Sequence, residues 1–261
     1  LARADGVVVD TQFSAISAGT ELLVYRDEVP SNIAADTTID ALDGDLSYPV
    51  RYGYATVGDV VATGDDVSTD WTGRTVFAFN PHESRFPATP DALIPVPDDV
   101  QAETMAMLPS VETATSLVLD GQPRIGERVV VFGAGIVGLW TVRHLSSFPL
   151  ETLVVVEPIA ERREHARRFG ADRAISPADV DDLDLTDGDR DGADLVFELS
   201  GNPAALDDAL AVTGYDSRVV VGSWYGTKRA DVDLGTQFHR DRVSIESSQV
   251  STLSPSSRGR Y

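Results

Sequence analysis

Hydrophobic and polar positions follow two different patterns in the two parts of the chain. Up to about residue 100, short apolar runs at 6–13, 54–62 and 74–79 are separated by Gly, Asp and Pro, which is typical of β-strands joined by turns. From residue 128 onward, apolar strand patterns alternate with helical ones. The predicted strands cover 128–132, 152–156, 194–199, 218–222 and 243–247, and the predicted helices cover 136–147, 159–169 and 203–212. This alternation predicts an α/β fold in which a β-rich domain is followed along the chain by a doubly wound parallel sheet.

The domain boundaries follow from these patterns. A largely helical stretch over 104–119 joins the two parts, so the predicted domains are 1–112 and 113–251. Residues 177–194 hold eight aspartates and predict a solvated acidic loop. The Ser- and Arg-rich residues 252–261 predict a poorly packed tail.

The first strand of the second part runs directly into Gly133-Ala-Gly-Ile-Val-Gly138. In this G-x-G-x-x-G turn, Gly133 allows the tight bend, Gly135 lets the backbone approach a pyrophosphate, and Gly138 lets the next helix pack on the strand. Ile136 and Val137 begin that helix, where free N–H groups can bind phosphate. The spacing predicts a dinucleotide site.

An acidic residue follows at the expected distance. Glu157 ends the next strand, nineteen residues after Gly138, where a carboxylate can accept the ribose hydroxyls of an adenosine. The same charge would repel a 2′-phosphate, so the sequence favours NAD over NADP.

Composition excludes several other classes of protein. Forty-two acidic residues stand against twenty-one basic ones, for a net charge of −21, and there is no cysteine. Disulfides and thiolate chemistry are therefore excluded, and a nucleic-acid or membrane partner is not expected. Without a leader-like segment, we expect a cytoplasmic protein. The acidity resembles that of proteins from salt-loving microbes, in which concentrated salt screens self-repulsion.

Together the two parts resemble the medium-chain dehydrogenase/reductase superfamily, whose alcohol-dehydrogenase-like members pair a GroES-like β domain with a Rossmann domain. The resemblance rests on Ile16-Ser-Ala-Gly-Thr-Glu21, on Tyr52-Gly-Tyr-Ala-Thr-Val-Gly-Asp-Val-Val61, on Ala106-Met-Leu-Pro-Ser-Val-Glu-Thr-Ala114 and on the glycine turn. It implies a nicotinamide cofactor and a small-molecule substrate, with a homodimer or tetramer as the possible assembly. Typical members begin before the equivalent of Leu1 and return to the catalytic domain after that of Tyr261, so this chain resembles a fragment.

The zinc positions of the family are changed in this chain. Zinc-binding members have a Cys at the position of Ala18. They have a His-Glu pair at the positions of Tyr54 and Ala55. The third ligand position falls within 107–110, which offers no zinc donor. We therefore expect a zinc-independent enzyme. The segments 17–21 and 238–250 favour a zinc-lacking branch that resembles bacteriochlorophyllide hydroxyethyl dehydrogenases and sugar or polyol dehydrogenases.

The resemblance also suggests catalytic residues in the first part. Thr20 stands where the family relays the substrate proton, or it is a turn threonine. Tyr54 replaces a zinc ligand and could donate to a carbonyl oxygen, or it is a packing aromatic. His82, in the loop 80–85, is a candidate general acid or base, or a solvated loop histidine.

In the second part, the resemblance implies further cofactor contacts. They are Thr113, Leu199, Ser200, Val221 and Gly222. The expected activity is hydride transfer between nicotinamide and a secondary alcohol or carbonyl. Two alternatives stay open: a quinone- or enoyl-type reductase on the same fold, and a dinucleotide-binding protein without activity.

Overall fold

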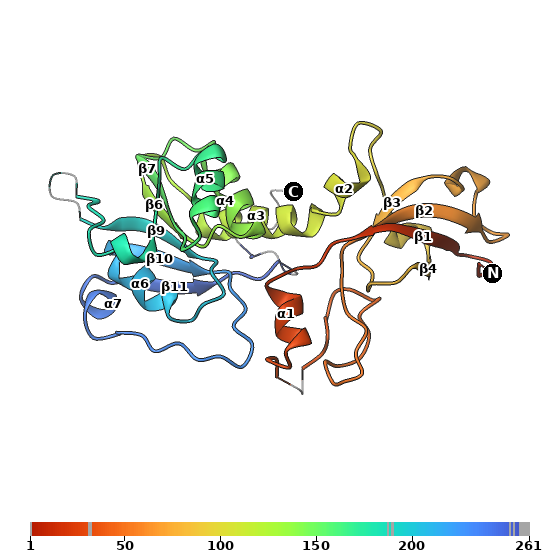
Figure 1. Ribbon diagram of the computed structural model, residues 1–261, viewed down its shortest axis with the longest axis horizontal. Helices are drawn as coiled ribbons and strands as arrows, with labels where there is room; N and C mark the ends of the chain where they lie inside the picture. The colour runs from red at the N-terminus through yellow and green to blue at the C-terminus, as the bar shows by residue number, and fades with distance from the viewer. Residues whose placement is uncertain are drawn as a thin grey trace. The chain divides into compact units, whose positions relative to one another are not determined.

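The computed structural model of the chain describes residues 2–30, 33–186, 188, 191–250, 252 and 254–255 (Figure 1). It divides into two compact units, Leu1–Pro109 and Ser110–Tyr261. The helix α3 (Leu108–Gly121) spans this division and also contains the boundary predicted after residue 112. Most of the predicted tail, 252–261, lies outside the described residues.

The first unit is built on a five-stranded antiparallel sheet in the order β4-β1-β2-β3-β5. Its strands are β1 (Val7–Ser14), β2 (Thr56–Thr63), β3 (Thr75–Ala78), β4 (Arg85–Ala88) and β5 (Ile94–Pro95). Neighbouring residues of a strand point to opposite faces, so Val76 packs with Val7 and Val9, whereas Phe77 packs with Val57 on the other side. Both faces are therefore covered.

Two short α-helices also belong to the first unit. On one face, α2 (Ala102–Met105) is followed by Ala106, which packs against Val57 and Phe77. The other helix, α1 (Thr20–Tyr25), buries Leu23 and Val24 against Leu46. The sequence pattern did not predict α1, because six residues are too few to show a helical period.

The second unit is a six-stranded parallel sheet in the order β11-β10-β9-β6-β7-β8. Its strands are β6 (Arg128–Phe132), β7 (Thr152–Val156), β8 (Arg173–Ile175), β9 (Ala193–Glu198), β10 (Thr213–Val221) and β11 (Ser244–Ser247). If β6 is counted as the first strand of this unit, the order reads 6-5-4-1-2-3, which is that of a Rossmann fold. The predicted fold class is confirmed.

Helices cover both faces of the parallel sheet (Figure 1). One face packs against α3, α4 (Ile136–Leu145) and α5 (Ala160–Arg168), through buried residues such as Leu117, Val142 and Ala166. The other face packs against α6 (Ala205–Ala211) and the region of α7 (Gln237–Arg240). The central strands are buried on both sides, which explains their uninterrupted valine runs.

Some elements differ from the predicted pattern. β8 and β4 were not predicted, because three or four residues with charged or proline neighbours carry little periodic signal. β10 begins at Thr213 rather than at 218, and the predicted acidic loop contains a short 3₁₀ turn, Pro177–Asp179, with residues 187, 189 and 190 outside the described part. No helix among the described residues has the length and apolar character needed to span a membrane.

Candidate functional site

The glycine turn joins β6 to α4 at the carboxyl end of the sheet. Gly133 has φ of +97°, which is unfavourable for any residue with a side chain, and its amide donates to the carbonyl of Val156 at 2.8 Å. At Gly138 a Cβ would lie 2.1 Å from the carbonyl oxygen of Gly133. At Gly135, by contrast, a Cβ would meet nothing within 4 Å. The first and last glycines are thus required by the chain itself, while the middle one leaves open space at the start of α4.

The other predicted cofactor residues of the second unit gather at the same edge. Leu199 donates its amide to Phe132 at 2.8 Å, and its backbone lies 2.8 Å from where a Cβ of Gly133 would stand. Gly222 follows β10 and donates to the carbonyl of Glu198 at 3.0 Å. Strand order reverses between β6 and β9, and ligands of open α/β sheets bind at such a point.

Helix α3 also reaches this edge. A Cβ at Gly222 would lie 2.6 Å from a methyl carbon of Leu117 and 2.7 Å from one of Leu199. Thr113 lies one helical turn before Leu117 on α3. Ser200 follows Leu199, and Val221 ends β10 beside Glu198 of β9. The structure therefore brings these predicted residues together, although their contacts with a cofactor stay predictions.

Glu157 lies beside the glycine turn. The residue is 3% exposed, and its carboxylate accepts hydrogen bonds from the backbone N–H of Ala134 at 2.8 Å and of Ile159 at 2.9 Å. Each carboxylate oxygen therefore already has one donor and keeps one further lone pair. Glu157 holds the turn against the end of β7, a role that the sequence did not predict, in addition to the predicted ribose contact.

A second buried carboxylate at this edge was missed by the sequence analysis. Glu198 ends β9, is fully buried and accepts hydrogen bonds from the amide of Ser200 at 2.8 Å, from the Ser200 hydroxyl and from the phenol of Tyr225. Burial and the Glu198 charge together raise the pKa of Tyr225 far above its ordinary value. The available signal was an acidic residue at the end of an otherwise apolar strand.

In the first unit, the three predicted catalytic residues lie in one cluster of side chains. His82 follows β3, and its Nε2 lies 2.6 Å from a carboxylate oxygen of Glu21. Its Nδ1 is hydrogen-bonded to the hydroxyl of Ser14, at the end of β1. Gly53 has φ of +118°, and a Cβ there would lie 2.7 Å from the imidazole, so the ring requires glycine at this position. Glu21 and Ser14 were not predicted, although Glu21 directly follows Thr20 in the motif.

Tyr54 lies beside the start of α1, where its phenol is hydrogen-bonded with the side chains of Ser17 and Thr20. Burial raises the pKa of its phenol, whereas hydrogen bonds with the side chains of Ser17 and Thr20 act in the opposite direction. The nearby charge of Glu21 also raises it. One oxygen of the Glu21 carboxylate accepts a hydrogen bond from the backbone N–H of Ser17 at 2.8 Å, and the other is bonded to His82. The carboxylate therefore connects His82 with Ser17, whose side chain is bonded to Tyr54.

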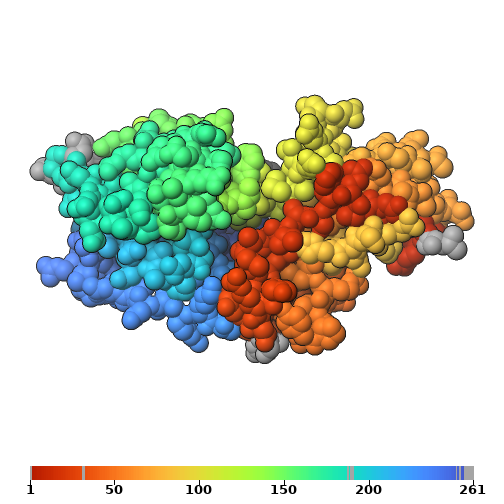
Figure 2. Space-filling model, in the orientation of Figure 1, coloured from red at the N-terminus to blue at the C-terminus, as the bar shows by residue number. Residues whose placement is uncertain are grey.

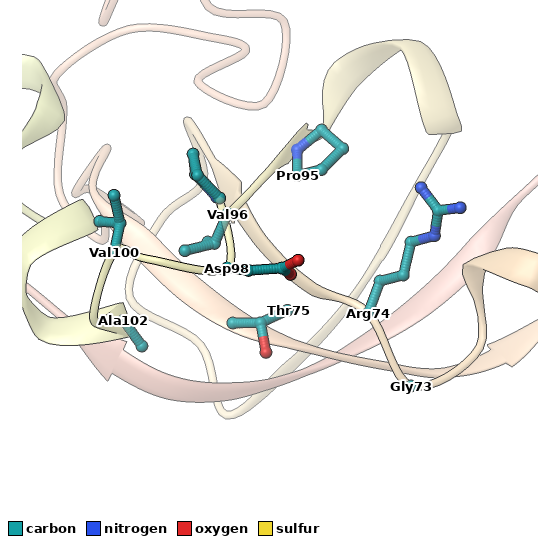
Figure 3. Close-up of a pocket in the computed structure, with 9 residues that line it drawn as sticks. Gly73, Arg74, Thr75, Pro95, Val96, Asp98, Val100 and Ala102 are labelled. Carbon is teal, nitrogen blue, oxygen red and sulfur yellow. The ribbon is translucent and has the colours of Figure 1, made fainter.

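Two hollows in the described part of the chain lie away from these residues. One, of about 530 Å³, lies in the first unit between β3, β5 and the start of α2, and its lining includes Arg74, Thr75 and Asp98 (Figure 3). Another, of about 560 Å³, lies in the second unit near the acidic segment. Neither is lined by a predicted catalytic or cofactor residue, so neither defines the candidate site.

The chain is similar to known dehydrogenases. Residues 137–258 match the family described as zinc-binding dehydrogenase. The D-guloside 3-dehydrogenase of Escherichia coli (strain K12) is 26% identical over 257 residues, which cover 93% of this chain and 73% of that enzyme. The chain is a homologue of the alcohol-dehydrogenase-like enzymes.

Solved structures with nicotinamide cofactors share the fold of this alcohol-dehydrogenase-like enzyme. A short-chain alcohol dehydrogenase of E. coli CFT073, complexed with NADH, superposes with a TM-score of 0.71 at 18% identity, over 96% of this chain and 77% of that one. A zinc-binding dehydrogenase of Sinorhizobium meliloti 1021, bound to NADP, gives a TM-score of 0.74 at 17% identity, over 94% and 77%. At these identities, the likeness shows the fold alone.

The family name implies zinc, and the side chains can be tested against it. The chain has no cysteine, and among the residues that the structure describes no three His, Asp or Glu side chains lie close enough to hold a metal ion. The cluster in the first unit offers one imidazole and one carboxylate, His82 and Glu21, which are bonded to each other. Zinc takes at least three thiolate, imidazole or carboxylate donors from a protein, so this donor set does not fit it.

Proposed function

We propose that this alcohol-dehydrogenase-like enzyme oxidises a secondary alcohol, or reduces the matching carbonyl, with NAD(H) and without zinc. The observation that carries the proposal is the open backbone at Gly135, placed at the strand-order reversal of the parallel sheet. Helix α4 begins at the next residue, and its free N–H groups favour a phosphate there. A bound nicotinamide supplies the hydride acceptor or donor.

The preference for NAD rests on Glu157. Its carboxylate is fixed beside the glycine turn by two backbone N–H groups, so the negative charge cannot move away from the adenosine side of the site. A 2′-phosphate at this place would meet an acidic group, whereas ribose hydroxyls could donate to its remaining lone pairs.

Without a metal, this chain's own groups must handle the substrate proton. Tyr54 keeps its proton at neutral pH, because a tyrosine phenol ordinarily ionises only near pH 10 and burial raises its pKa further, so it can donate a hydrogen bond to a carbonyl oxygen. The hydroxyl of Thr20 bonds with Tyr54 and can orient that phenol. His82 can accept or return a proton.

For the substrate, we propose a sugar or polyol. The relative's name, D-guloside 3-dehydrogenase, describes oxidation at a ring carbon, which is a secondary alcohol. Sugar and polyol dehydrogenases are also among the zinc-lacking enzymes that the sequence resembles.

The first test is a fluorescence titration with NADH and with NADPH in about 2–3 M KCl, where the acidic surface is screened. We expect NADH to bind more tightly than NADPH, and Glu157→Ala to reduce that preference. Folded protein that binds neither dinucleotide would contradict the proposal.

Turnover and metal dependence are tested next with sugar alcohols and glycosides. We expect NAD reduction that survives dialysis against a chelator, in protein that contains less than stoichiometric zinc. Tyr54→Phe should lower kcat about 10- to 100-fold, with NADH affinity unchanged. Loss of activity on chelation, restored by zinc, would overturn the zinc-free mechanism but not the cofactor assignment.

A further inference from the structure

The hydrogen bonds around His82 define which ring nitrogen is basic. Glu21 is 8% exposed, and its carboxylate can only accept hydrogen bonds when ionised, so the contact of 2.6 Å requires a proton on Nε2. In the neutral imidazole, Nδ1 is then the acceptor, and the Ser14 hydroxyl must donate to it. The lone pair of Nδ1 therefore points toward the Ser14 hydroxyl.

The far end of this chain of bonds is accessible. Ser14 is exposed at the end of β1, and 33% of the His82 side chain is exposed. The N-terminal segment, coloured red, forms part of the visible surface (Figure 2). Because the Ser14 hydroxyl covers the lone pair of Nδ1, a proton that reaches this nitrogen while the bond holds must pass through the Ser14 oxygen.

We propose that Ser14, His82 and Glu21 form a proton relay, in which Ser14 takes the proton of the substrate hydroxyl and Glu21 positions the imidazole. The inference rests on the proposed function. Ser14 is then a further catalytic residue, and Glu21 is a positioning residue that acts through His82.

In this relay the proton of the alcohol moves by way of Ser14 to His82. The O–H bond of the alcohol breaks and its proton passes to Ser14 Oγ, while the proton of Ser14 passes to His82 Nδ1. A bound nicotinamide would accept the electron pair of the alcohol's C–H bond as hydride, which would leave the carbonyl. The resulting imidazolium is paired with the Glu21 carboxylate until it releases its proton to water.

One arm of the test is independent of activity. The chain has four histidines, and His82→Gln identifies the ¹⁵N signals of His82 in an NMR spectrum. Under alkaline conditions we expect the Nε2–H tautomer. In Glu21→Gln, the amide oxygen should keep the Ser17 N–H, which places the NH₂ group against Nε2 and should switch the ring to the Nδ1–H tautomer.

The matched control for that substitution is Glu83→Gln. Glu83 is paired with Arg51 at 2.9 Å and not with His82, so its variant removes a nearby charge without changing the tautomer. A wild-type ring protonated at Nδ1, or no tautomer change in Glu21→Gln, would overturn the role of Glu21 whether or not the protein oxidises alcohols.

The second arm is kinetic. We expect kcat to fall about 10²- to 10⁴-fold in Glu21→Gln and at least about 10-fold in Ser14→Ala, with NADH affinity unchanged. Ser14→Thr, which keeps the hydroxyl, should retain activity. Full activity in Ser14→Ala would overturn the relay while leaving the proposed dehydrogenase intact. Wild-type protein that binds NADH but oxidises no alcohol would overturn both, and the tautomer result would still decide what Glu21 does.

Discussion

At the scale of single residues, the glycines of the turn separate folding from cofactor binding. Gly138→Ala would place a methyl group 2.1 Å from the Gly133 carbonyl oxygen, whereas Gly135→Ala meets no protein atom within 4 Å. We expect Gly138→Ala to lower the free energy of unfolding by about 1–3 kcal/mol. Gly135→Ala should keep the stability but weaken NADH binding at least about 10-fold.

Denaturant titration and NADH fluorescence on both variants check this prediction. Each variant is the control for the other, since both add one methyl group to the same turn. Equal NADH affinity in Gly135→Ala and wild-type protein would contradict the assignment of Gly135 to the pyrophosphate.

The phenol of Tyr54 gives a prediction about pH. Its pKa is raised in the folded protein by burial, so the folded state keeps the proton to higher pH than the unfolded chain does. Tyr54 therefore adds no pH dependence to stability below about pH 10, where both states are protonated, and stability falls as pH rises above that value. The loss should be smaller in Tyr54→Phe, as measured by urea unfolding from pH 8 to 11. Parallel curves for the two proteins would show that the phenol ionises freely in the fold.

At the scale of elements, the segment after β10 is held to β9 by the bond between Tyr225 and Glu198. Tyr225→Phe would leave a fully buried carboxylate with one donor fewer, which should cost about 1–3 kcal/mol of stability. Gly222 lies in this segment, so we also expect weaker NADH binding.

Tyr215→Phe is the control for that change, because Tyr215 is 71% exposed on β10 and losing its hydroxyl should be neutral. Thermal unfolding of the three proteins provides the measurement. A Tyr225→Phe variant as stable as Tyr215→Phe would mean that Glu198 finds another donor or is protonated.

At the scale of the whole molecule, the net charge of −21 predicts salt dependence. The Debye length falls from about 10 Å at 0.1 M salt to about 3 Å at 1 M, so self-repulsion is largely removed. We expect the apparent Tm to rise by at least about 5 °C between 0.1 and 2 M KCl.

A charge variant distinguishes screening from a general salt effect. Asp65, Asp66, Asp98 and Asp99 are exposed, and changing all four to Asn should raise the Tm at 0.1 M KCl more than at 2 M KCl. The same increase at both salt concentrations would contradict an electrostatic origin.

Much of the second unit could be predicted from local pattern. Strands buried on both faces need continuous apolar runs, as in Arg128–Phe132 and Thr152–Val156, and a turn that approaches a phosphate needs glycine. The short elements α1, β4 and β8 could not be predicted, because three to six residues fit any period. Their positions depend on packing against distant segments, such as Leu23 and Val24 against Leu46.

The sequence by itself therefore determined the fold class, the glycine turn, the acidic surface and the absence of cysteine ligands, because each depends on the types and spacing of neighbouring residues. Only the tertiary structure brought Ser14, Glu21 and His82 together, across sequence separations of up to 68 residues. It also showed that Glu157 and Glu198 are buried and hydrogen-bonded. Burial and hydrogen-bond partners are set by which segments meet in space, and local pattern does not record that.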